Sequence, residues 1–159
     1  MSYEFPAAVL VAAWESHYVL GGYGSWVKRD PLGVLLATLT CSANTFIRNP
    51  NEAAKMLISD QAVYTPAEFH ARLSPESLWV MVQHNPPFWH PPKRVRTPLL
   101  WLAGEKDATI SVEAGRRSAA YYGANFVCVP DSAHNIMLER SYRQTAETLQ
   151  DWLRQHNIR

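Results

Sequence analysis

The sequence predicts an α/β fold with a parallel β-sheet, and two observations lead to this class. Continuous apolar runs at residues 7–12, 97–104 and 126–130 have the length and composition of buried strands. A segment with helix-capping residues separates the second run from the third, which is the order of a βαβ unit. Since a chain of 159 residues has room for one real core, we expect a single domain.

The run at residues 7–12 is expected to be a third strand of the same sheet. It follows Pro6, and its short length and its valines favour a buried strand over a helix. Its carboxyl end leads into residues 14–18. This loop is therefore expected at the sheet edge where the other two strands end, which is where ligands bind in open α/β sheets.

Between residues 30 and 83 the sequence predicts four short helices. Each begins with a capping side chain, followed by proline at the first helical position: Asp30-Pro31, Asn49-Pro50, Thr65-Pro66 and Ser74-Pro75. The apolar residues of each helix form one stripe that is expected to face inward, in the first helix Leu32, Leu35, Leu36 and Leu39. Four helices are more than a simple crossover connection between two parallel strands needs. Residues 14–92 are therefore interpreted as a helical cap or lid inserted between two strands. A packing layer without a gating role is the alternative.

Two further helices are expected in the last third of the chain. Ser111 is placed to cap the first of them, and Gly123 is placed to end it. A capping box at residues 141–144 is expected to begin the second. The buried stripe predicted for this last helix is Tyr142, Ala146, Leu149 and Leu153.

An acid and a histidine follow two neighbouring strands of the predicted sheet. Asp107 lies in a glycine turn after residues 97–104, and His134 lies in the turn after residues 126–130. Adjacent parallel strands are about 4.8 Å apart, so two turns at one edge can touch. A carboxylate there can accept a hydrogen bond from the imidazole Nδ1 and leave Nε2 as a general base. Ordinary turn roles for both residues are the alternative.

The pattern from Thr97 to Leu153 resembles the C-terminal part of an α/β-hydrolase. The resemblance is carried by the Gly104–Asp107 turn, the helix that ends at Gly123, the turn before His134 and the final helix. It implies a partial α/β-hydrolase fold of about three parallel strands with a four-helix cap insertion. It also implies that Asp107 is the acid and His134 the base of a catalytic triad.

The nucleophile of such a triad is missing from the sequence. A serine hydrolase places it in a G-x-S-x-G turn, and no such turn occurs in the 159 residues. Ser25 comes nearest to this pattern, but it is only a weak candidate. Tyr23 and Val27, two places before and after it, are too large for that turn. We also find no His-Gly oxyanion loop. The chain thus resembles the second half of the fold, and the strand at residues 7–12 lacks an upstream partner. We expect poor solubility, a homodimer, or a separately encoded N-terminal half.

The resemblance implies a hydrolase of the esterase or lysophospholipase type. Its substrate would be a small hydrophobic acyl compound, its nucleophile Ser or Asp, and no cofactor would be needed. The chain alone is expected to be inactive. A triad without its nucleophile can still position a substrate, but it loses nearly all of its catalytic effect. The alternative is a non-catalytic remnant or a module that binds a small molecule or a partner strand, with Asp107 and His134 as relics.

Composition excludes several other classes of function. A net charge of +1 with 18% charged residues gives no signature of nucleic-acid or membrane binding. No apolar run reaches the roughly 18 residues that span a bilayer. Residues 1–4 lack signal-peptide features, and Cys41 and Cys128 have no metal-ligand spacing, so we expect reduced thiols in the cytoplasm. His84 and His90 lie in a proline-rich linker without neighbouring ligands, so no metal site is expected.

Overall fold

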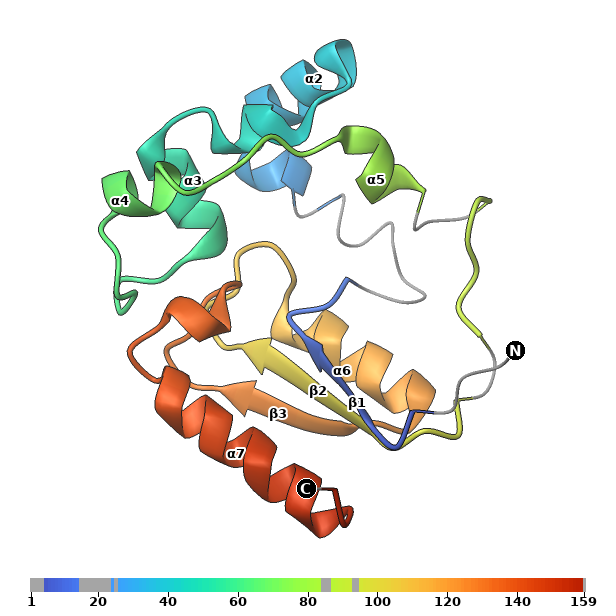
Figure 1. Cartoon of the computed structure of the whole chain (residues 1–159). Coiled ribbons are helices and arrows are strands. Elements are labelled where there is room, and N and C mark those ends of the chain that lie inside the picture. The colour runs from blue at the N-terminus through green and yellow to red at the C-terminus, as the bar shows by residue number, and fades with distance from the viewer. Residues whose placement is uncertain (1–4, 15–23, 25, 84–86, 93–94, 159) are drawn as a thin grey trace.

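A three-stranded parallel sheet forms the base of the molecule. The computed structural model describes residues 5–14, 24, 26–83, 87–92 and 95–158. The strands are β1 (Ala8–Val11), β2 (Leu99–Gly104) and β3 (Asn125–Val129), in the order β1-β2-β3 (Figure 1). Both pairs are parallel, with Val9 opposite Leu100 and Leu102 opposite Val127. This confirms the predicted fold class and all three expected strands.

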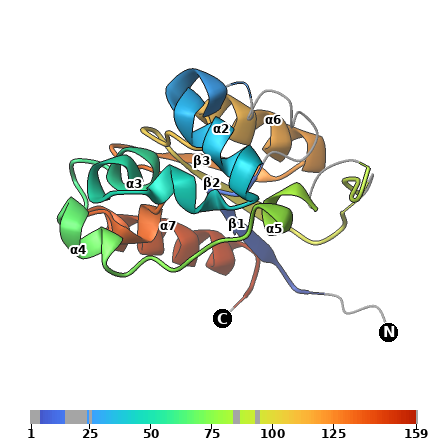
Figure 2. The same cartoon turned by 90° about the horizontal axis from the view of Figure 1, so that it is seen from above.

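Helices cover both faces of the sheet, which explains why β2 is apolar along its whole length. Helix α6 (Val112–Tyr122) lies on one face and α7 (Tyr142–Gln155) on the other (Figure 2). Leu100 and Leu102 pack in one cluster with residues of α7. On the opposite face Trp101 approaches Gly115 of α6, where an added Cβ would lie 3.2 Å from the indole Nε1.

The helices between β1 and β2 lie beyond the carboxyl ends of the strands (Figure 1). We call residues 26–82 the helical cap. Its elements are α2 (Pro31–Thr40), the 3-10 helix η1 (Ala43–Ile47), α3 (Pro50–Leu57), α4 (Pro66–His70) and α5 (Leu78–Val82). Three of the four predicted helix starts are confirmed, because Asp30, Asn49 and Thr65 each accept a backbone N–H bond at the start of a helix.

The fourth predicted start is wrong. Helix α5 begins at Leu78 with Ser77 as its cap, and not at Ser74-Pro75. The segment before it pairs with η1 instead, since the Glu76 carbonyl accepts the Ala43 N–H at 3.2 Å. Ser77 also forms an isolated antiparallel bridge with Ser42. These contacts hold the segment in an extended conformation, so the helix begins only at Leu78.

The predicted inward stripe of α2 is also wrong. Leu32, Leu35 and Leu39 are 54%, 55% and 72% exposed, whereas Gly33 and Ala37 are buried. An ideal Cβ on Gly33 would overlap the Asp30 carboxylate, which caps α2 and pairs with Arg48. This close packing turns the small residues toward the core, where Ala37 joins Trp26, Ala43, Phe46 and Met56 in one cluster.

In α7 the predicted stripe is half right. Leu149 and Leu153 pack on the sheet together with Trp152, but Tyr142 and Ala146 are exposed. The capping box expected at residues 141–144 is absent, because the Ser141 side chain makes no capping bond and its Oγ lies 3.0 Å from the Ser132 Oγ. No helix in the described part of the chain combines the length and the apolar character needed to cross a membrane.

Candidate functional site

Asp107 and His134 are in contact, as the sequence predicted. The imidazole Nδ1 lies 2.9 Å from the carboxylate Oδ2. The Asp107 side chain is 1% exposed and that of His134 is 23% exposed. The turn after β2 supplies the acid, and the turn after β3 supplies the histidine. The contact arises because these parallel strands are neighbours and end at the same edge.

Both oxygens of Asp107 are engaged, which fixes the direction of the carboxylate. The Thr109 N–H donates to Oδ1 at 2.7 Å, and the Ile110 N–H donates to the same oxygen at 2.9 Å. Oδ2 is left to accept the imidazole N–H. With the proton on Nδ1, the His134 Nε2 has a free lone pair, which is the form a general base needs.

A glycine brings the two turns together. An ideal Cβ on Gly104 would lie 2.3 Å from the Ala133 carbonyl oxygen and 2.5 Å from that of Ser132. Every other residue type would push the histidine turn away from the end of β2. Two backbone bonds close the same junction, from the Glu105 N–H to the Val129 carbonyl and from the Lys106 N–H to the Ser132 carbonyl.

Glu139 is a buried carboxylate that the sequence analysis did not single out. It is 1% exposed, and its Oε1 accepts the Ala133 N–H at 3.1 Å and the Ser59 N–H at 3.0 Å. Its Oε2 accepts the Ser59 hydroxyl at 2.7 Å. Glu139 thus joins the cap to the residue before His134. Its only sequence signal is an acid placed directly after the apolar run of η2 (Ile136–Leu138).

The cap is also bonded to the two turns that hold the pair. Trp26 Nε1 donates to the Thr109 carbonyl at 3.1 Å, and the Thr109 hydroxyl donates to the Met56 carbonyl at 2.8 Å. The Asn135 N–H donates to the Leu57 carbonyl at 2.9 Å. The cap therefore rests on the acid turn through Thr109 and on the histidine turn through Asn135.

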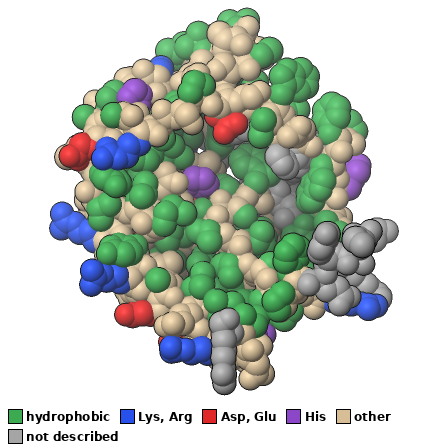
Figure 3. Space-filling model, in the orientation of Figure 1, with side chains coloured by type: hydrophobic (Ala, Val, Ile, Leu, Met, Phe, Trp, Pro, Cys, Tyr) green, Lys and Arg blue, Asp and Glu red, His purple; other side chains and the backbone are tan. Residues whose placement is uncertain are grey.

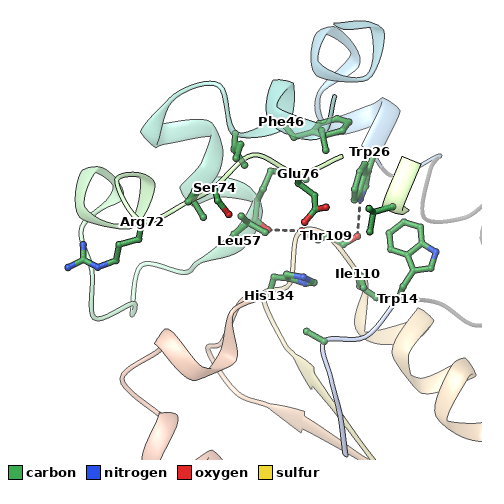
Figure 4. Close-up of a pocket in the computed structure, with 16 residues that line it drawn as sticks. Trp14, Trp26, Phe46, Leu57, Arg72, Ser74, Glu76, Thr109, Ile110 and His134 are labelled. Atoms are coloured by element: carbon green, nitrogen blue, oxygen red, sulfur yellow. Dashed lines mark hydrogen bonds between the residues drawn. The ribbon is translucent and has the colours of Figure 1, made fainter. Parts of the chain in front are cut away.

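A pocket of about 550 Å³ lies between the cap and the sheet edge. Figure 3 shows this face of the molecule hollowed, with apolar side chains around the hollow. His134 lies on its floor and the cap forms its roof (Figure 4). Trp14, Trp26 and Phe46 form an aromatic wall, in which neighbouring rings meet edge to face with centroids 5.6 and 4.8 Å apart.

Some of the other candidate residues are not described by the structure. Ser25, His84 and the loop at residues 15–18 lie outside the described residues, so their expected roles stay predictions. Burial raises the pKa of the Cys128 thiol, and the Glu105 carboxylate adds to that rise. Nowhere in the described ranges do three or more His, Cys, Asp or Glu side chains gather closely enough to hold a metal ion.

Solved structures of α/β-hydrolases are similar to this chain in their fold. A thermophilic esterase matches with a TM-score of 0.60 and 16% identity over 95% of this chain and 57% of its own. The putative non-heme bromoperoxidase BpoC from Mycobacterium tuberculosis H37Rv matches at 0.59 and 16%, over 91% and 56%. Rv0554 from the same species matches at 0.51 and 14%, over 91% and 55%. No protein-family model and no curated protein matches the sequence.

The chain therefore has a partial α/β-hydrolase fold, as its resemblance to that family predicted. It spans little more than half the length of the structures it matches. At identities of 14–16% the likeness defines the fold and not the activity.

Proposed function

We propose that this chain supplies the acid and the base of a hydrolase triad that cleaves esters or similar acyl compounds. The observation that carries the proposal is the 2.9 Å contact between Asp107 Oδ2 and His134 Nδ1. The contact lies at the carboxyl edge of a parallel sheet, and the imidazole borders a largely apolar pocket. A buried carboxylate bonded to the Nδ1 of an imidazole, whose ring borders a pocket, is the arrangement that orients a general base.

In the proposed reaction, His134 Nε2 removes the proton of the nucleophile as it attacks the acyl carbonyl. The same nitrogen gives that proton to the leaving alcohol. In a second step it removes a proton from water, which attacks the acyl group and releases it from the nucleophile, and the proton goes back to the nucleophile. Asp107 is a positioning residue, which holds the imidazole in the Nδ1–H tautomer and stabilises the imidazolium. The pocket would hold a small hydrophobic acyl substrate against its aromatic wall.

The nucleophile is proposed to come from polypeptide outside these 159 residues, on the same chain or on another. The sequence contains no G-x-S-x-G turn, and Ser25 has bulky neighbours two places away on each side. Strand β1 supports this view, because it lies at an edge of the described sheet and pairs with β2 alone. Its other edge is suited to a further strand, from a missing half of the fold or from a second copy of the chain.

The tautomer of His134 tests the assigned roles. In ¹⁵N-labelled protein, we expect the proton on Nδ1 in the native chain and on Nε2 in Asp107→Asn, since the amide NH₂ would then donate to Nδ1. His134→Gln assigns the resonance. An unchanged tautomer in Asp107→Asn would refute the pairing in solution and favour the alternative of a non-catalytic binding module.

Hydrolysis of a p-nitrophenyl ester tests the missing nucleophile. We expect no turnover by the isolated chain above that of His134→Ala. Turnover that persists in Ser25→Ala and disappears in His134→Ala would mean that another residue of this chain is the nucleophile.

Size-exclusion chromatography tests the proposed pairing at the free edge of β1. A stable monomer at high concentration would contradict this pairing.

A further inference from the structure

Apart from the His134 imidazole, two ionisable side chains border the pocket. They carry opposite charges and point in different directions. These residues are Arg72 and Glu76, both contributed by the cap. The rest of the described lining is apolar or carries hydroxyl groups. The direction in which each of the two charges points therefore decides the electrostatic character of the pocket.

Arg72 directs its charge away from the pocket. Its guanidinium lies 4.4 Å from the centroid of the Tyr64 ring, and its NH1 donates to the Glu68 carbonyl at 2.6 Å. Figure 4 shows the side chain extending outward from the space above His134. The positive charge is thus used within the cap and does not face a ligand.

Glu76 directs its carboxylate into the pocket. Figure 4 shows the side chain pointing from the cap toward Thr109 and His134. Its backbone is fixed, since Asn44 Oδ1 accepts the Glu76 N–H at 2.9 Å. One carboxylate oxygen accepts the Ser77 N–H at 3.1 Å, and no ion pair to Glu76 occurs among the residues that the structure describes. The carboxylate can therefore receive a donor from a ligand.

We propose that the pocket selects ligands in which an apolar body carries an ammonium group. The ammonium would lie at Glu76, and the apolar body would pack on the aromatic wall that Trp26 and Phe46 help to form. For catalysis this rests on the proposed function, because the acyl carbonyl of a cationic ester would then lie toward His134. Compounds with a carboxylate in the same place are disfavoured by repulsion from Glu76.

Three probes of one shape test the proposal by calorimetry at neutral pH: 3-phenylpropylammonium, 3-phenylpropanol and 3-phenylpropionate. We expect the cation to bind about tenfold more tightly than the anion, with the alcohol between them. In Glu76→Gln this order should collapse to within about twofold while the affinity for the alcohol stays the same. The amide oxygen can still accept the Ser77 N–H, so the fold is retained.

Glu113→Gln is the matched control, because it removes the same charge from a residue of α6 that does not line the pocket. It should leave the order of affinities unchanged. Each bound probe should also shift the His134 ring resonances, which places it in this pocket. Equal affinities for the cation and the anion, an order that persists in Glu76→Gln, or no binding of any probe would each overturn the proposal.

The two proposals fail independently. If the His134 tautomer depends on Asp107 but the probes show no preference for the cation, only the ligand class is wrong. If Glu76 selects the cation but Asp107→Asn leaves the His134 tautomer unchanged, the pocket binds ammonium compounds and the hydrolase role is wrong.

Discussion

Replacing Glu139 by alanine should destabilise the protein by about 3–5 kcal/mol. The Ala133 N–H is buried, and leaving it without an acceptor costs about 1–3 kcal/mol. Ser59 is half-buried, so water can reach its two donors and their loss adds about 1 kcal/mol. The buried Cγ methylene of Glu139, which alanine lacks, contributes about 1 kcal/mol more. This is a large part of the roughly 5–15 kcal/mol that stabilises a typical domain.

Urea denaturation followed by circular dichroism measures the free energy of unfolding of this variant. Glu139→Gln keeps one oxygen that can accept both N–H bonds, so it should lose only about 1–2 kcal/mol. Glu147→Ala is the matched control, since Glu147 is exposed on α7, and its effect should stay within about 0.5 kcal/mol. If Glu139→Ala lost less than about 1 kcal/mol, the three bonds would not hold the cap to the histidine turn in solution.

Three further predictions concern the junction and the cap. Gly104→Ala should cost about 2 kcal/mol or more and disturb the His134 resonances, because its Cβ would overlap the Ala133 carbonyl; unchanged spectra and stability would contradict this. The Arg48 guanidinium bonded to Asp30 holds the pKa of that carboxyl below its usual value. Stability from this group is therefore complete above about pH 4 and is lost as the pH falls through the lower folded value. Urea denaturation across this range should show a weaker acid dependence in Asp30→Asn, whereas Asp151→Asn, at an exposed site, should keep the native profile. Leu35→Ser should change the unfolding free energy by less than about 0.5 kcal/mol, since Leu35 is largely exposed; a loss above 1 kcal/mol would mean that this face is covered in solution.

The strands and most helix starts follow from local sequence. Residues 99–104 are apolar on both faces because a central parallel strand is covered twice, and that pattern is visible without a structure. Asp30, Asn49 and Thr65 cap helices through bonds to residues three places away, so the signal lies within one turn. The pairing of Asp107 with His134 was predictable for a related reason, since neighbouring parallel strands end at one edge.

Contacts between distant segments decided the rest. A helical period shows that α2 has an apolar stripe, but the packing of Gly33 against Asp30 chose which side is buried. The start of α5 depended on pairing with η1, which no capping signal reports. Glu139 gains its role from Ser59, eighty positions earlier.

By itself, the sequence determined the three parallel strands, most of the helix starts and the acid and histidine at one sheet edge. These features depend on neighbours along the chain or on the simple geometry of adjacent strands. Only the tertiary structure decided the buried face of α2, the anchoring of the cap by Glu139 and the direction of the Glu76 carboxylate. Each of these depends on which distant groups come into contact, and periodicity and capping signals carry no information about such contacts.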